Sequence, residues 1–252
     1  MSGHSKWAGI KHKKAIVDAQ KGKTFSKLIR ELTVAARHGG DPESNPRLRL
    51  VMAKAREANM AKDKVEQAVK RGTGEIPGVH YEDIQYEGYG PGGVAILADA
   101  LTDNKNRTSS EIRSLFANHG GNMAGAGSVA WLFHKKGYLI VPSSGVSEER
   151  LIELALEAGA DDVAAEAAHF AVTTPLPEFE RVKLALTQGR IAWESADVTM
   201  MPSSTVKVDG AKAKPLLELV EALEEHEDVQ NVYANFDIPD EILNNVMGNE
   251  ER

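Results

Sequence analysis

The order of strand-like and helix-like segments between Lys135 and Ser203 constrains the fold of this chain more than any other feature. Alternating apolar residues mark the strands, and a 3.6-residue apolar period marks the helices. The segments follow one another as strand, helix, strand, strand, helix, strand, at residues 137–142, 147–159, 160–166, 169–175, 177–189 and 192–202. This is the order of a ferredoxin-like unit, so we expect residues 135–203 to form an α+β domain of that kind.

The segments on either side of this unit predict a second α+β domain, which the first one interrupts. Before it come two strands joined by the glycine-rich turn Gly90–Gly93, then a helix and a further strand, at residues 81–90, 93–103, 106–121 and 128–137. After it come a helix and a strand, at residues 214–229 and 230–238. We therefore expect residues 79–134 and 204–243 to form one discontinuous ferredoxin-like domain, with residues 135–203 inserted into it.

The first 78 residues predict a small domain of three helices preceded by an arm. Apolar residues recur with helical spacing from Lys23 to Ala36, and Gly39 is a C-terminal stop. A second helix begins where Asn45 can act as its cap and Pro46 occupies the first helical position. A third short helix is expected to end at Gly72.

Positive charge is concentrated in this first domain, although the whole chain carries a formal net charge of -7. Met1–Glu75 contains 17 lysine and arginine residues against 8 aspartates and glutamates, whereas the remaining residues contain 13 against 29. Such asymmetry indicates that one domain binds a polyanion. The alternative is a lysine-rich helical surface that is only solvated.

The placement of the cations favours a nucleic-acid-binding site. In the first helix they fall opposite the apolar stripe, and in the second they flank it on both sides. The arm adds lysines beside an aromatic ring that can stack on bases or pack on the helices. The predicted site comprises Lys6, Trp7, Lys11, His12, Lys13, Lys14, Lys23, Lys27, Arg30, Arg37, Arg47, Arg49, Lys54 and Arg56. Lys105 and Arg107, at a predicted helix start, form a candidate anion site.

Signatures of an enzyme are missing from the sequence. There is no cysteine, the eight histidines are dispersed, and Gly22-Lys23-Thr24 lacks the first glycine and the strand of a P-loop. The glycine-rich stretches 89–93 and 120–127 could cradle phosphate but are as readily turns, and the acidic run Glu224–Asp228 is interpreted as a solvated face. We therefore expect no catalytic activity, metal, cofactor or small-molecule substrate. No apolar run is long enough to span a membrane, which favours a cytoplasmic protein.

Seven motifs in order closely resemble the YebC/PmpR family: GHSKWAGIKHKKA, KGKTFSKLIRELTVAAR, DPESNPRLR, RGTGE, YEGYGPGGVA, LTDNKNRT and GSVAWLF. The resemblance covers nearly the whole chain and departs from many members at Gly9 and Ala61, neither of which is on the cationic face. It implies a three-domain protein described as a probable transcriptional regulator, with a mitochondrial relative that activates translation. Some members are similar to DNA-binding regulators and others to ribosome-associated factors.

Charge and resemblance together predict a nucleic-acid-binding regulator of gene expression. Phosphate contacts give affinity without distinguishing DNA from RNA, so two partners remain open. DNA is the first expectation because the family description points to transcription; ribosomal RNA or the ribosome is the alternative. The acidic α+β domains are a further candidate surface for a protein partner.

Overall fold

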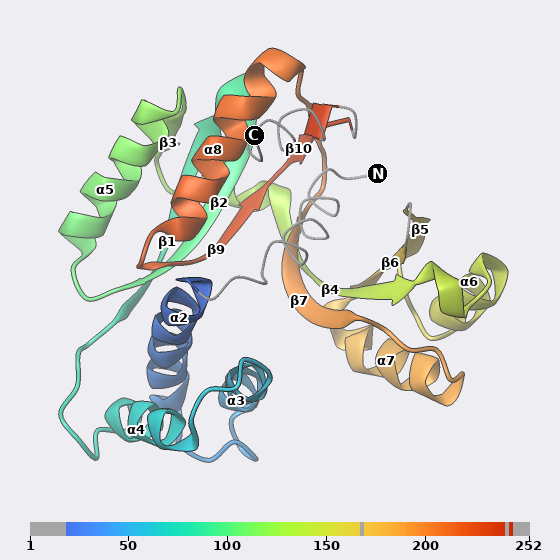
Figure 1. The fold of residues 1–252 in the computed structure, drawn as a ribbon, viewed down its shortest axis with the longest axis horizontal. Coiled ribbons are helices and arrows are strands. Elements are labelled where there is room, and N and C mark those ends of the chain that lie inside the picture. Colours follow the sequence, from blue (N-terminus) through green and yellow to red (C-terminus); the bar gives the residue numbers. More distant parts are fainter. Residues whose placement is uncertain (1–18, 167–168, 240–241, 244–252) are drawn as a thin grey trace. The chain divides into compact units, whose positions relative to one another are not determined.

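The structure, a computed structural model, describes residues 19–166, 169–239 and 242–243, and element labels follow Figure 1. Among these residues, Trp131–Lys207 and Asn235–Asp237 form one compact unit and the rest form another. The sequence predicted three domains, whereas contacts divide the chain into two units, with the N-terminal helices and the first sheet in the same one. The boundaries of the three domains therefore stay a prediction. No helix of the described ranges has the length and apolar character needed to cross a bilayer.

The unit around residues 131–207 has the predicted ferredoxin-like topology. Its elements are β4 (Phe133–Pro142), α6 (Glu148–Glu157), β5 (Asp162–Ala165), β6 (His169–Pro175), α7 (Phe179–Gln188) and β7 (Ser195–Pro202). The sheet order is β5-β6-β4-β7, with every neighbouring pair antiparallel. Leu151 of α6 and Val182 of α7 pack with Leu139 of β4 in one buried cluster, so both helices cover the same face.

One strand replaces two predicted ones at the start of this unit. The segments 128–137 and 137–142 were expected to be separate, but β4 runs through Gly137 without a break. A Cβ at Gly137 would lie 2.2 Å from the Phe179 ring and 2.4 Å from Oγ1 of Thr174. This glycine therefore permits close packing within a strand and does not mark its end.

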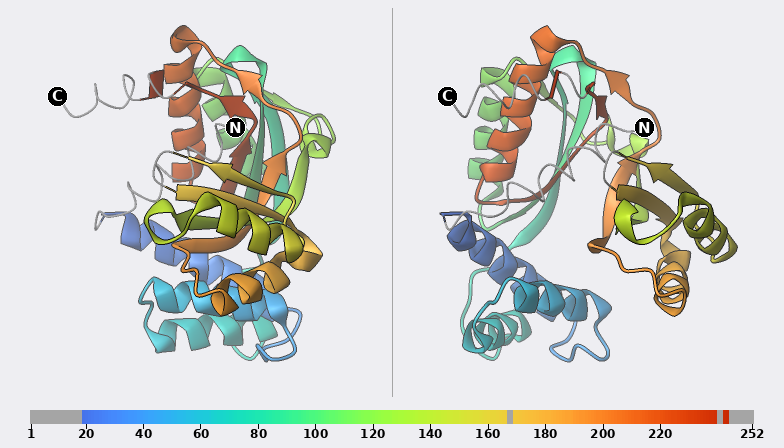
Figure 2. Two further views of the ribbon diagram at one scale, coloured as in Figure 1. Left: turned by 90° about the vertical axis from the view of Figure 1, so that its right-hand side faces the viewer. Right: turned by 45° about the vertical axis from the view of Figure 1, so that its right-hand side comes forward.

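The other sheet comprises β1 (Glu82–Gly90), β2 (Val94–Thr102), β3 (Asn122–Ala124) and β9 (Val229–Ala234) in the order β3-β1-β2-β9. Helices α5 (Lys105–Asn118) and α8 (Gly210–Glu225) lie side by side on one of its faces (Figures 1 and 2). The α+β class is confirmed, but the ferredoxin-like topology predicted for this part is wrong, because the β1–β2 hairpin forms the centre of the sheet. The predicted last strand is divided: β9 pairs with β2, and β10 (Phe236–Asp237) pairs with β8 (Val206–Lys207).

The three predicted N-terminal helices are present as α2 (Ala19–Ala36), α3 (Pro46–Glu57) and α4 (Lys62–Thr73). Their apolar faces share a core that includes Leu32, Leu48 and Ala68. The predicted cap of α3 is confirmed, because Oδ1 of Asn45 accepts a hydrogen bond from the Leu48 amide at 3.1 Å. The same side chain donates through Nδ2 to main-chain carbonyls just after and within α2, which ties the two helices together.

The end of α4 differs from the prediction. The left-handed residue that terminates it is Gly74, with φ of 81°, and not Gly72. Gly72 lies inside the helix, where an added Cβ would be 2.3 Å from the carbonyl oxygen of Thr33 and 2.6 Å from Cβ of Ala36. Gly72 therefore allows α4 to approach α2 closely, a role that a single sequence does not distinguish from a helix stop.

Candidate nucleic-acid interface

Arg30, predicted to lie on the nucleic-acid-binding face of α2, is instead buried. Its exposed fraction is 9%, and it donates hydrogen bonds to the carbonyl oxygen of Glu227 and, at 2.5 Å, to the Glu227 carboxylate. Its other partner is the carboxylate of Asp228, 3.3 Å away. Arg30 is therefore a structural residue that holds α2 against the start of β9.

The neighbouring lysines of α2 contact the same segment, Glu224–Asp228, which we name the acidic turn. Nζ of Lys27 donates to the Glu224 carbonyl oxygen at 2.7 Å. Lys23 lies 3.7 Å from the Glu225 carboxylate, and both of these side chains are more than half exposed. The acidic turn was interpreted from the sequence as a solvated face. Glu225 and Glu227 are exposed, but Asp228 is buried and the turn also contacts the α2 cations.

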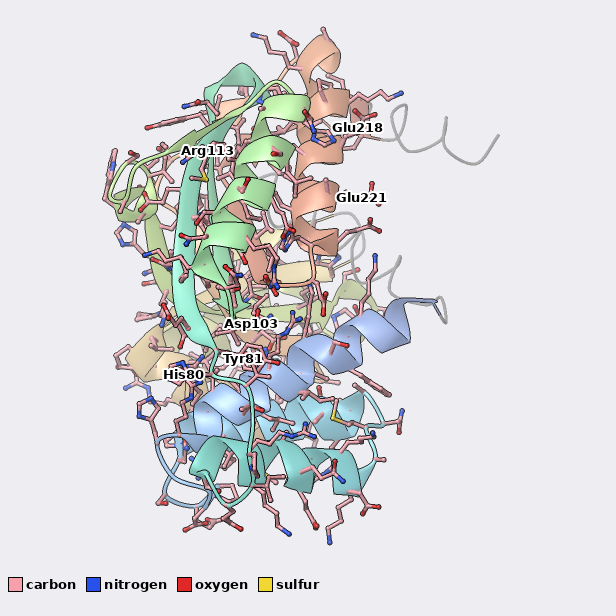
Figure 3. All side chains as sticks on the ribbon, turned by 90° about the vertical axis from the view of Figure 1, so that its left-hand side faces the viewer. His80, Tyr81, Asp103, Arg113, Glu218 and Glu221 are labelled. Carbon is pink, nitrogen blue, oxygen red and sulfur yellow. The ribbon has the colours of Figure 1, made fainter. Side chains whose placement is uncertain are left out.

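Arg37, predicted together with the α2 cations, lies directly after the end of α2 and contacts the chain that leads into the sheet. Its guanidinium donates to the carbonyl oxygen of Tyr81 at 2.5 Å. The ring of Tyr81 lies beside α2 (Figure 3), with the Arg30 guanidinium 5.7 Å from its centroid. All four cations predicted on this helix thus have partners within the chain.

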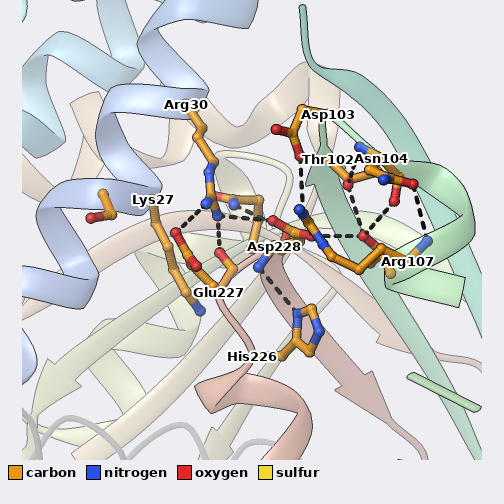
Figure 4. Close-up of polar contacts among 12 residues, drawn as sticks. Lys27, Arg30, Thr102, Asp103, Asn104, Arg107, His226, Glu227 and Asp228 are labelled. Atoms are coloured by element: carbon orange, nitrogen blue, oxygen red, sulfur yellow. Dashed lines mark hydrogen bonds and ion pairs between the residues drawn. The ribbon is translucent and has the colours of Figure 1, made fainter. Parts of the chain in front are cut away.

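Asp228 is the centre of a buried polar cluster, which we name the Asp228 cluster (Figure 4). Its exposed fraction is 2%, and Oδ2 accepts hydrogen bonds from Thr108 at 2.6 Å and from Arg107 at 2.8 Å, while Oδ1 faces Arg30. Burial by itself would raise the pKa of Asp228. The hydrogen bonds from Thr108 and Arg107 and the charge of Arg30 outweigh burial and hold that pKa below its ordinary value.

Local sequence explains why Arg107 and Thr108 reach this carboxylate. Asn104 caps α5 by accepting from the Arg107 amide at 3.1 Å, which fixes the first turn of the helix beside the turn into β9. The Arg107 guanidinium is shared between Asp103 at 2.9 Å and Asp228. The candidate anion site is therefore not assembled as expected: Lys105 is exposed, whereas Arg107 serves the Asp228 cluster.

One group of acidic and histidine side chains beside the cluster is close enough to hold a metal ion, namely Glu111, His226 and Asp228. Their donor atoms already have partners. Nε2 of His226 faces Glu111 at 3.0 Å, Nδ1 accepts from the Asp228 amide, and the Asp228 oxygens face two arginines. A divalent cation would lie against these guanidinium groups, so the group does not fit a metal site.

The glycine-rich loop at 120–127, considered above as a phosphate cradle, leads into a run of amides that bind a carboxylate of the chain itself. Glu87 is 4% exposed and accepts from the amides of Gly127 and Val129 at 2.6 Å and of Ala130 at 2.8 Å. Burial would raise its pKa, but these hydrogen bonds lower it below the ordinary value. These three amides are therefore already satisfied by Glu87 and are not free to bind phosphate.

The predicted cations of α3 are closer to solvent than Arg30. Arg47 is exposed and pairs with Asp83 at 3.2 Å, and Lys54 is half-buried. Arg49 and Arg56 are exposed and lie two turns apart, so they share one stripe of the helix. Within the part of the chain that the structure describes, Arg49 makes only long contacts, at 3.4 Å, to the main-chain carbonyls of Pro42 and Glu43. Four further exposed cations on α4 were not predicted: Lys62, Lys64, Lys70 and Arg71.

The cations of the predicted arm lie outside the described residues: Lys6, Trp7, Lys11, His12, Lys13 and Lys14. Besides the α4 cations, sequence reasoning missed the buried acceptors Asp228 and Glu87 and the donor Thr108 among the described residues. A signal for Asp228 was present, since the acidic run at 224–228 is the natural counterpart of a cationic helix face. No pattern in one sequence pairs two segments almost 200 positions apart.

Comparison with known proteins gives matches along nearly the whole chain. A family model for the TACO1/YebC N-terminal domain matches residues 5–75, and one for the second and third domains matches residues 81–236. A protein of Syntrophobacter fumaroxidans named "Probable transcriptional regulatory protein" is 53% identical over 98% of this chain and 100% of its own. A protein of Dictyoglomus turgidum with the same name is 55% identical over 96% of this chain and 98% of its own.

A solved structure is similar as well. The crystal structure of a conserved hypothetical protein from Aquifex aeolicus shares 49% sequence identity and superposes with a TM-score of 0.79. The superposition covers 91% of this chain and 95% of that one. The similarity therefore extends beyond one domain to most of the chain.

Proposed function

The chain belongs to the TACO1/YebC family, and from that membership we propose that it regulates transcription by binding DNA. The observation that carries this proposal is the sequence identity of 53% and 55%, over nearly the whole chain, to relatives named as probable transcriptional regulatory proteins. The predicted membership in the YebC/PmpR family is confirmed by the same matches. The protein acts by binding, without a catalytic step, and in the cytoplasm.

The exposed stripe of α3 supports a DNA-binding role. Arg49 and Arg56 project from it and have no carboxylate partner among the described residues, so they can neutralise phosphates. Guanidinium groups also match phosphate geometry and can reach guanine edges. Together with the arm, this stripe replaces the α2 face as the primary contact surface. A protein partner for the acidic α+β segments remains a prediction.

The test measures binding of the full-length protein to duplex DNA across a series of salt concentrations. Changing Arg49 and Arg56 to glutamine should weaken binding and lower the slope of log affinity against log salt by up to about 1.8, roughly 0.9 per lost phosphate contact. The matched control changes the exposed Lys135 and Lys207 of the other unit to glutamine, which removes the same charge and should leave the slope unchanged.

Two outcomes would contradict the proposal. Equal loss in both double variants would mean that only net charge matters and that the α3 stripe is not the site. Co-sedimentation with ribosomes, combined with no preference for any promoter DNA in cells, would favour the translation alternative over transcription.

A further inference from the structure

The α2 cations and the acidic turn face one another within one compact unit. Three cations of α2 contact the turn: Lys23 faces Glu225, Lys27 donates to Glu224, and Arg30 binds both Glu227 and Asp228. Carboxylate and carbonyl oxygens here occupy the positions that phosphate oxygens would take on a cationic helix. We propose that the acidic turn masks a second phosphate-binding surface on α2 and competes with nucleic acid for it; this rests on the proposed function.

The contact between α2 and the acidic turn has a buried part, the Arg30–Asp228 pair, which we expect to stay intact when nucleic acid binds. Arg30 and Asp228 are both nearly inaccessible to solvent, and Asp228 is held as well by Thr108 and Arg107. Removing either partner would leave a buried charge unpaired. Arg30 therefore anchors α2 and is not part of the surface that exchanges.

The exposed part of the contact, which includes the Lys23–Glu225 pair, can exchange its acidic partner for phosphate. The side chains of Lys23 and Glu225 are 58% and 64% exposed, and ion pairs with that exposure contribute little to stability. Phosphate can displace the Glu225 carboxylate from Lys23 and the Glu224 carbonyl oxygen from Lys27, while Arg30 keeps both Glu227 and Asp228.

Exchange would replace a neutral hydrogen-bond acceptor of Lys27 by a charged one. Lys27 donates to the main-chain carbonyl of Glu224, which is a neutral oxygen. A hydrogen bond from an ammonium group to an anionic phosphate oxygen is stronger than one to a neutral carbonyl. Nucleic acid that is first held by α3 would bring phosphates to α2 at high local concentration, which favours displacement of the acidic turn.

The experiment uses the full-length variant Glu225→Gln with duplex DNA. The changed side chain is exposed, and Arg30 keeps both Glu227 and Asp228, so thermal unfolding should match that of the wild type. We expect tighter binding at low salt and a slope of log affinity against log salt that is steeper by roughly 0.9, since Lys23 becomes available to a phosphate.

A matched control separates masking from net charge. Changing Glu218 to glutamine removes the same charge from an exposed position of α8 two turns before Glu225, where the carboxylate pairs with Lys214 at 3.8 Å (Figure 3). No steepening in the Glu225→Gln variant, or an equal effect in the control, would overturn masking and leave the proposed function standing. If no form bound duplex DNA, wild type included, the proposed function would fall and masking with it.

Discussion

Two carboxylates, Asp228 and Glu87, each organise a different junction of the chain although neither was singled out by the sequence. Asp228 joins α2, α5 and the start of β9 by accepting from Thr108 and facing two arginines. Glu87 joins β1 to the amides of residues 127–130. Both are buried and well supplied with donors, so each is costly to neutralise or remove.

Changing Asp228 to asparagine should destabilise the protein by about 3 to 5 kcal/mol, because Arg30 and Arg107 lose the negative charge that compensates them in a buried setting. Urea unfolding followed by circular dichroism measures the effect. The control is Asp83→Asn, which breaks the exposed pair with Arg47 and should cost less than about 1 kcal/mol. Similar losses in the two variants would contradict the central role of Asp228.

The acid limb of stability should depend on Asp228. Its pKa in the folded protein is lowered from 3.8, so the stabilisation that it provides is fully present above pH 3.8 and is lost as the pH falls through the lower folded-state pKa. The difference in unfolding free energy between wild type and Asp228→Asn should accordingly be constant near neutral pH and shrink below pH 3.8. Urea titrations at stepped pH test this; a difference that grew on acidification would have the wrong sign.

Helix crossings depend on glycines whose role differs from position to position. Gly72 allows α4 to contact Thr33 and Ala36 of α2, whereas Gly22, within α2 itself, has no atom within 4 Å of an added Cβ. The same residue type is therefore required at one site and dispensable at the other.

Alanine at Gly72 should destabilise the protein by about 1 to 3 kcal/mol through overpacking against α2. Alanine at Gly22 should stabilise it by roughly 0.5 to 1 kcal/mol, since that position is helical, exposed and open. Thermal unfolding of the two single variants distinguishes them. Stabilisation by both would show that α4 and α2 separate freely enough to accept the added methyl group.

The sequence predicted which face of each helix is apolar but not what covers the opposite face. The caps and cores follow from local chemistry, as Asn45 and the α2 stripe illustrate. Arg30 could not be placed, because its burial depends on Asp228 almost 200 residues away. Gly137 and Gly72 were misread for the same reason, since the atoms that require a glycine come from other elements.

At the scale of the whole molecule, the chain separates positive from negative charge and then brings part of each together again. Most cations lie in the first 75 residues, while the acidic turn comes near the end of the sequence. Their contact engages the α2 cations and leaves the exposed cations of α3 and α4 as the basic surface of the described N-terminal helices. Counting charges along a chain therefore overestimates how many of them are available to a ligand.

The insertion of a complete ferredoxin-like unit between α5 and β9 has a consequence for biosynthesis. β2 is almost entirely buried in the finished sheet, between β1 and β9. On the translating ribosome, however, β9 emerges about 130 residues after β2, a delay of roughly 6 to 25 s at ordinary elongation rates. Throughout that interval the β2 edge of the nascent hairpin is available for intermolecular pairing. The yield of folded protein therefore depends on chaperones that protect this edge until β9 is made.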